Sequence, residues 1–135
     1  MKANELMIGD WVKITHRNKI GKVYRVDIAN GNGNGWVAVI DGDYYEGDLE
    51  PIPLTPEILE KNGFEKVYDK YKLPNYRIKW NSYTDLYFTV FTGVDGYWNP
   101  IGLNVITGGI PATVDYVHQL QNALRLCGID KTIEL

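Results

Sequence analysis

The sequence contains few of the side chains on which most catalytic and metal sites depend. It has one cysteine, Cys127, and two histidines among its 135 residues. A single cysteine cannot form an intrachain disulfide or a thiolate metal cluster, and it fits a reducing compartment. Neither the G-x-S-x-G nucleophile elbow nor the H-E-x-x-H zinc motif occurs. We therefore predict no cofactor, no metal site and no catalytic residue, and we expect a protein that is not an enzyme.

The sequence also lacks a long apolar run and an excess of positive charge. No window approaches the roughly 18 apolar residues of a membrane span, and the N-terminal "MKANELMIGDW" has no apolar core of the kind found in signal peptides. We expect a soluble protein of the cytoplasm with no membrane partner. The formal net charge is −3, so any binding to nucleic acid would depend on a local patch rather than on the overall charge.

What the sequence does have is enough apolar material for a core, since 44% of its residues are hydrophobic and 13% are aromatic. In the first part of the chain, short apolar segments alternate with turn residues, as in "GDWVKIT", "GKVYRVDI", "GWVAVID" and "YYEGDLEPI". Four or five short antiparallel strands over such a length predict a small SH3-like β-barrel over residues 1–53.

A glycine-rich tract, "NGNGNG", separates two of these predicted strands. A dinucleotide-binding fingerprint needs the spacing G-x-G-x-x-G at the start of a helix. Here Trp36 stands where the third glycine should be, and a strand follows. Because Asn and Gly tolerate the positive φ angles of hairpin turns, we interpret the tract as a turn and not as a phosphate-binding loop.

The segment that follows, "LTPEILEKNGF", has helix signals at both ends. Thr55 can cap the first turn, and Pro56 suits the first helical position. Gly63 can end the helix in a left-handed conformation. We therefore predict a short helix over residues 56–62.

The rest of the chain is predicted to form an antiparallel sheet and a last helix. Residues 64–107 hold four strand-like segments, among them "YRIKW", which alternates apolar and basic residues. The last helix is expected over 114–127, with Thr113 as its cap and Gly128 as its end. The predicted fold class is α+β: an SH3-like barrel, a helix, an antiparallel sheet and a C-terminal helix. We expect the barrel and the unit of residues 54–135 to share one core.

Three segments of the sequence carry a resemblance: "IGDWV" near the start, "PIPLTPEILEKNGF" in the middle and "YVHQLQN" near the end. Together they resemble a family of small uncharacterised proteins of gut Bacteroidales, found in their phages and mobile elements. The segments come in the family's order and bracket nearly the whole chain, and "YVHQLQN" is the most specific of them. The C-terminal "ALRLCGIDKTIEL" departs from the family's pattern. The resemblance implies an origin and an architecture, and it supplies no catalytic residue.

The last predicted helix carries a polar cluster made of His118, Gln119, Gln121 and Asn122. On a helix His118 and Asn122 lie one turn apart on the same side, so they could jointly hold a ligand or the backbone of a partner. The alternative is that the cluster bonds to nearby backbone and supports the fold, which we favour because buried polar groups usually do so. An enzyme centred on His118 is the least favoured hypothesis, since the motif contains no acid partner for the imidazole.

Two surfaces of the predicted barrel are candidates for binding. In the leading hypothesis the chain is a noncatalytic protein-binding or adaptor module of a phage or mobile element, and a protein partner docks on Trp36, Tyr44 or Tyr45. The alternative is a nucleic-acid-binding accessory protein that uses the basic segment "KITHRNKIGKVYR" beside Trp11 and Tyr24.

The residues of this candidate nucleic-acid patch are Lys13, Arg17, Lys19, Lys22 and Arg25. Residues 1–54 carry six basic and eight acidic residues, so the patch would be local and sensitive to salt. An ordinary solvated hairpin explains the same residues, and we favour that interpretation.

Overall fold

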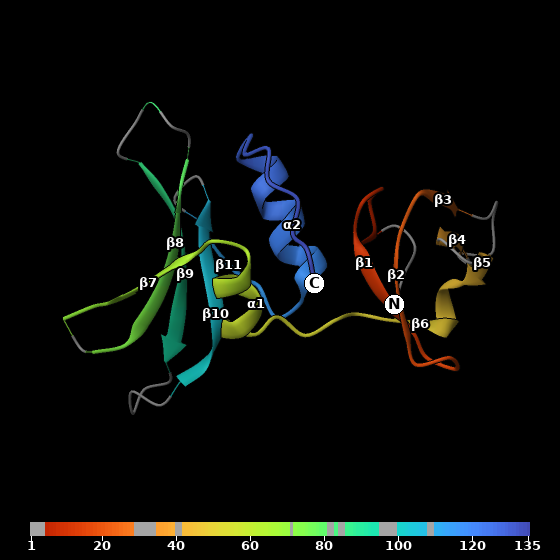
Figure 1. Cartoon of the computed structure of the whole chain (residues 1–135), viewed down its shortest axis with the longest axis horizontal. Coiled ribbons are helices and arrows are strands. Elements are labelled where there is room, and N and C mark those ends of the chain that lie inside the picture. The colour runs from red at the N-terminus through yellow and green to blue at the C-terminus, as the bar shows by residue number, and fades with distance from the viewer. Residues whose placement is uncertain are drawn as a thin grey trace. The chain divides into compact units, whose positions relative to one another are not determined.

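The computed structural model describes residues 5–28, 35–39, 42–70, 72–80, 83, 86–94, 100–107 and 110–135. The chain divides into two compact units, one of residues 1–53 with 116–118 and the other of residues 54–115 with 119–135. Antiparallel sheets and two α-helices occur together, so the predicted α+β class is confirmed (Figure 1). No helix of the described residues is long and apolar enough to cross a membrane.

The first unit contains two three-stranded antiparallel sheets. The first sheet has β1 between β2 and β6, with bounds Trp11–Ile14, Lys19–Lys22 and Leu49–Glu50. The second has β4 between β3 and β5, with bounds Gly35–Val39, Arg25–Ile28 and Gly42–Tyr45. A 3-10 helix, Glu46–Asp48, leads from β5 into β6. The antiparallel pairing of β3 with β4 is the hairpin expected around the glycine tract, while residues 29–34 themselves lie outside the described part.

The chain passes from one sheet to the other at Val23 and Tyr24. The sequence indicates a single strand in "GKVYRVDI", but the structure has β2 and β3 on either side of these two residues. The backbone of Val23 pairs with the N-terminal segment instead: its N–H donates to the Asp10 carbonyl at 2.8 Å, and its carbonyl accepts from the Gly9 N–H at 2.7 Å. This pairing separates the two strands and directs them into different sheets.

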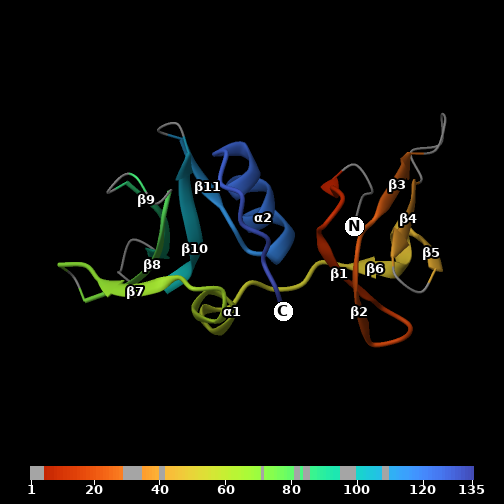
Figure 2. The same cartoon turned by 45° about the horizontal axis from the view of Figure 1, so that its top comes forward.

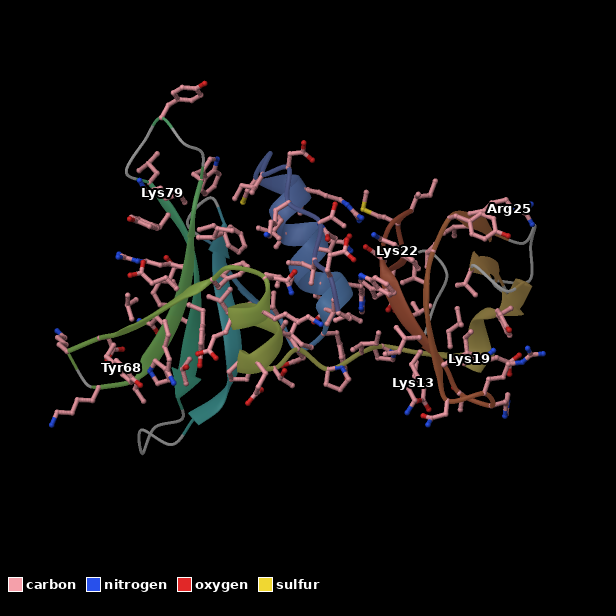
Figure 3. All side chains as sticks on the ribbon, in the orientation of Figure 1. Lys13, Lys19, Lys22, Arg25, Tyr68 and Lys79 are labelled. Carbon is pink, nitrogen blue, oxygen red and sulfur yellow. The ribbon has the colours of Figure 1, made fainter. Side chains whose placement is uncertain are left out.

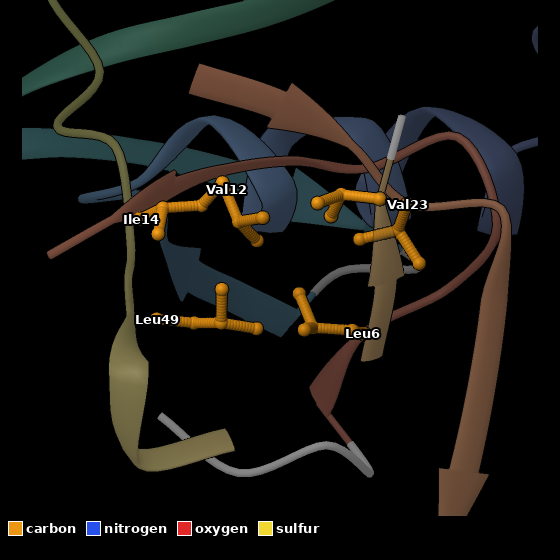
Figure 4. Packing of buried hydrophobic residues seen from close by; sticks show 6 residues of the cluster. Leu6, Val12, Ile14, Val23 and Leu49 are labelled. Atoms are coloured by element: carbon orange, nitrogen blue, oxygen red, sulfur yellow. The ribbon is translucent and has the colours of Figure 1, made fainter. Parts of the chain in front are cut away.

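Both sheets contribute to one core in the first unit (Figure 4). The core consists of Leu6, Val12, Ile14, Val23, Val39 and Leu49, with Val26 and Tyr44 partly buried against it. In β1 the burial alternates, so that Val12 and Ile14 face the core. A Cβ added to Gly21 of β2 would lie 3.0 Å from the Cβ of Val39 in β4. Glycine at this position therefore allows the two sheets to approach closely.

The second unit contains a five-stranded sheet in the order β11-β10-β9-β8-β7 (Figure 1, Figure 2). The strands from β7 to β11 are Glu65–Tyr68, Pro74–Lys79, Tyr87–Val94, Pro100–Thr107 and Ile110–Thr113. Each strand pairs antiparallel with its neighbour in the chain, which confirms the expected meander. The fifth strand was not predicted, because the expected strands ended at residue 107.

Helix α1, Pro56–Lys61, agrees with the prediction at both ends, although it stops one residue earlier than expected. The Thr55 hydroxyl accepts a hydrogen bond from the Ile58 N–H at 3.3 Å. Gly63 has a φ of 86°, the left-handed conformation that ends the helix. The local signals for this helix were therefore sufficient.

Helix α2 is Val117–Leu126, so it begins three residues later than predicted. Thr113 is not its cap, because Thr113 pairs with Asn104 in the β10–β11 ladder. The turn into the helix is closed instead by Gln119, whose Oε1 accepts from the Asp115 N–H at 2.9 Å. The predicted end at Gly128 is confirmed by its φ of 73°. Figure 1 and Figure 2 both show α2 beside β10 and β11.

Candidate functional site

Gln121 of the polar helix cluster supports the fold. Its side chain is 4% exposed, and both ends of its amide contact the backbone of the C-terminal segment. Nε2 donates to the Lys131 carbonyl at 2.7 Å, and Oε1 accepts from the Ile133 N–H at 2.8 Å. Because this amide is occupied by the chain's own tail, Gln121 is not available to a ligand in this structure.

Gln119 and Asn122 also have partners within the chain. Gln119 closes the turn before α2, as described above. The Asn122 Oδ1 accepts from Nη1 of Arg125, one turn further along the helix, at 3.0 Å. These contacts are those of a scaffold, and they do not bring the two side chains together as one site.

Asn62, like Gln121, binds the backbone of the C-terminal segment through its side-chain amide. The sequence analysis did not identify this residue. Its amide is 5% exposed. Nδ2 donates to the carbonyls of Ile58 and Glu134, each at 2.8 Å, and Oδ1 accepts from the Glu134 N–H at 2.7 Å. Glu134 lies 72 residues from Asn62 in the sequence. The local sequence around Asn62 therefore did not indicate this contact.

His118 lies in the first unit and is 4% exposed. Its ring stacks on Tyr116, with centroids 6.0 Å apart and planes at 12°. Within the described part of the chain, the buried Nδ1 has no hydrogen-bond partner. Burial lowers the pKa of the imidazole, while the carboxylates of Asp10 and Glu5 partly offset this effect. His118 is therefore neutral at neutral pH.

Asp10 is a second buried residue that the sequence analysis did not single out. It is fully buried, and its Oδ2 accepts from the Met7 N–H at 2.8 Å. Its own N–H donates to the Met7 carbonyl at 3.1 Å. Asp10 thus closes the turn that leads into "IGDWV". An aspartate that bonds to backbone a few residues away is a common turn feature, so its position in the sequence was the available signal.

The three candidate aromatic residues divide between the two faces of the β3–β4–β5 sheet. Trp36 is directly opposite Tyr45 in the β4–β5 register, and Tyr44 is opposite Val37. The side chain of Tyr44 is half-buried against the core. Because successive residues of a strand belong to opposite faces, Trp36 and Tyr45 belong to the outer face. Their side chains lie outside the part that the structure describes.

The five candidate basic residues do not form one continuous patch (Figure 3). Lys13 and Lys19 lie near the turn of the β1–β2 hairpin, and Lys22 lies at its other end. Arg17 is in the turn, with its guanidinium carbon 5.8 Å from the centroid of the Tyr44 ring. Arg25 begins β3 and so belongs to the other sheet.

Neither metal chemistry nor a known relative identifies a site. Among the described residues, no group of three or more His, Cys, Asp or Glu side chains is placed to hold a metal ion. No protein-family model, no curated protein and no solved structure matches the chain. Two surfaces of the first unit remain as candidates: the outer face of β3–β4–β5 and the β1–β2 hairpin.

Proposed function

We propose that the chain is a noncatalytic protein-binding module in which the first unit is an SH3-like barrel. A protein partner docks on the outer face of the β3–β4–β5 sheet, which carries Trp36 and Tyr45. The module acts in the cytoplasm as an adaptor of a phage or mobile element, the origin that the family resemblance implies.

The arrangement of the first unit supports the barrel. Small barrels of two packed sheets turn their corners where a strand bends from one sheet into the other. The chain makes such a transition at Val23 and Tyr24, between β2 and β3. The last strand, β6, returns to pair with β1, and residues of both sheets meet in one core. These observations support an interior shared by the two sheets, as an SH3-like barrel requires.

The cross-strand pair of Trp36 and Tyr45 is the observation that carries the proposed binding function. It belongs to the face opposite the one that Val26 and Tyr44 direct into the core. Asp27 is opposite Trp36 in the β3–β4 register. Trp and Tyr are the residues most enriched in the energetic centres of protein interfaces. Tyr44 is not part of this docking face, because it packs on the other side of the sheet.

The experiment compares stability with partner capture for single substitutions. Trp36→Ala and Tyr45→Ala should each lower the free energy of unfolding by about 1 kcal/mol or less, the usual contribution of a cross-strand pair. Each should reduce capture of the partner from native cells by at least about tenfold, as expected for an interface residue worth more than 1 kcal/mol. Tyr44→Ala should instead cost about 2 kcal/mol or more of stability, because its ring packs on the core.

Tyr68→Ala is the matched control, since Tyr68 is an exposed tyrosine of β7 in the second unit. It should change neither stability nor capture by a measurable amount. If Trp36→Ala unfolded the protein, Trp36 would belong to a core and the docking face would be wrong. Equal capture by the parent and by both docking-face variants would also reject the proposal.

A nucleic-acid-binding accessory protein is the second candidate function. The observation that favours it is the outward face of the β1–β2 hairpin, where Lys13 and Lys22 share a face with Trp11.

A further inference from the structure

We propose that the outer face of the β1–β2 hairpin binds single-stranded nucleic acid. This hairpin face consists of Trp11, Lys13, Ile20, Lys22 and Tyr24. It lies on the first sheet of the first unit, whereas the protein-docking face lies on the second sheet. The inference is therefore independent of the proposed protein-binding function.

The charge of this segment differs from that of the rest of the chain. Residues 11–26 contain five Lys and Arg residues and no Asp or Glu, although the whole chain has a net charge of −3. A polyanion approaching the protein would be attracted to this segment. The hairpin is thus a part of the chain whose charge complements a phosphate backbone.

The register of the hairpin places cations and apolar groups on one face. Val12 and Ile14 of β1 point into the core, so Trp11 and Lys13 point outward. Their cross-strand partners are Lys22 and Ile20, which share that face. Ile20 is 54% exposed.

Tyr24 is exposed just after the end of β2. Lys22 is half-buried and Val23 is buried. The next residue, Tyr24, is 53% exposed. Successive outward side chains of a strand are about 6.8 Å apart. Ile20 and Lys22 therefore lie in one outward row of the edge strand β2, and the exposed Tyr24 follows two residues after the end of this strand.

This combination suits a single strand better than a duplex. Phosphates of an extended strand can contact Lys13 and Lys22, while an unpaired base can stack on an exposed aromatic ring. The Lys22 Nζ already lies 5.3 Å from the centroid of the Trp11 ring, so a cation and an aromatic surface adjoin. Paired bases of a duplex do not expose their faces for stacking. Glu50 of β6 is opposite Lys13 on this face, so a carboxylate borders the proposed site at that lysine.

The test measures the fluorescence anisotropy of a labelled oligothymidylate titrated with the full chain at several salt concentrations. Two lysine–phosphate contacts predict that the logarithm of the association constant falls with the logarithm of salt with a slope of about −1.4. Lys13→Gln and Lys22→Gln should each make this slope shallower by about 0.7. Tyr24→Ala should weaken binding on the order of tenfold with the slope unchanged, because stacking releases no counterions.

Lys79→Gln is the matched control, since Lys79 is an exposed lysine at the end of β8 in the second unit (Figure 3). It should leave both the affinity and the salt slope unchanged. Thermal melts of all variants confirm that each is folded, and Lys13→Gln tests the charge without disturbing the contact between Lys22 and Trp11.

Three results would overturn the proposal. The first is no binding of the oligothymidylate at about 50 mM salt, where contacts to phosphate are strong. The second is a duplex bound as tightly as the single strand, which would exclude stacking. The third is binding to vesicles of anionic lipid without binding to the oligonucleotide, which would assign the hairpin face to a membrane surface. None of these results bears on capture of a protein by Trp36 and Tyr45.

Discussion

His118 is a buried residue whose protonation should change the stability of the protein at acidic pH. Burial keeps the pKa of its imidazole below the ordinary value of about 6.5. As the pH falls through about 6.5, the unfolded chain therefore takes up a proton that the folded chain does not. We predict that the free energy of unfolding decreases between about pH 6.5 and pH 5, as measured by urea melts.

Replacing the imidazole tests this cause directly. His118→Leu removes the titrating group while keeping much of its volume, so the decrease between about pH 6.5 and pH 5 should become shallower. His16→Gln is the matched control, because His16 is exposed and contacts Asp48 on the surface. An unchanged pH dependence in His118→Leu would show that other groups are responsible.

Gln121 gives a second prediction at the residue scale. Gln121→Ala removes the two hydrogen bonds that this amide makes with the Ile133 N–H and the Lys131 carbonyl, and this should cost about 2 kcal/mol or more of stability. Asn122→Ala, on the same helix, removes a half-buried contact with Arg125 and should cost less than about 1 kcal/mol. Urea melts of the two variants beside the parent make the comparison. Similar midpoints for the two variants would contradict the role assigned to Gln121.

The residues that could be predicted from the sequence are those whose partners are close in the chain. Thr55 and Gly63 act within a turn or two of their own helix, so their residue types were sufficient. The partners of Asn62 and Gln121 lie in the C-terminal segment and are fixed by packing alone. The sequence therefore indicated a polar cluster at 118–122 on the last helix, but not which of its side chains hold the C-terminal segment.

Among the elements, β11 shows why one strand was missed. Pro111 interrupts the segment "IPAT", and proline normally argues against a strand because it cannot donate to the ladder. In the structure β11 is an edge strand that pairs only with β10 among the described strands. Proline is tolerated at such an edge. The segment can form a strand because it lies at the edge of the sheet, and the local sequence does not indicate that position.

The β3–β4 hairpin gives a prediction at the element scale. Ile28 is opposite Gly35, so these residues can flank a two-residue turn directly. Replacing residues 29–34 by Asn-Gly, a favoured type I′ turn, should keep the fold and raise stability by up to about 1 kcal/mol through a shorter loop. Thermal melts measure the change.

The same variant tests the interpretation of the glycine tract. If the tract is only a turn, neither the parent nor the shortened chain should bind ATP or NAD, as isothermal titration would show. A loss of more than about 2 kcal/mol would mean that the tract makes contacts beyond those of a turn. Nucleotide binding by the parent that disappeared in the variant would restore the phosphate-binding interpretation.

For the whole molecule, the expected shared core remains a prediction, and the path of the chain supports cooperative unfolding. Residues 116–118 belong to the first unit, where Val117 is fully buried and its N–H donates to the Ile52 carbonyl at 2.9 Å. The remainder of α2 belongs to the second unit. Since one helix contributes to both units, calorimetry should show a single thermal transition. An isolated fragment of residues 1–53 lacks Val117 and should not fold; a stable fragment or two separate transitions would contradict this view.

The central claim concerns the docking face, and site-specific photo-crosslinking tests it most directly. A chain with a photoreactive phenylalanine analogue at position 45, introduced into its native cells, should form one discrete adduct with a partner protein. The adduct should disappear with Trp36→Ala and persist with Tyr68→Ala, because only Trp36 is opposite position 45 in the β4–β5 register. An adduct that formed equally well with Trp36→Ala, or no adduct at all while the chain stays folded, would contradict the account.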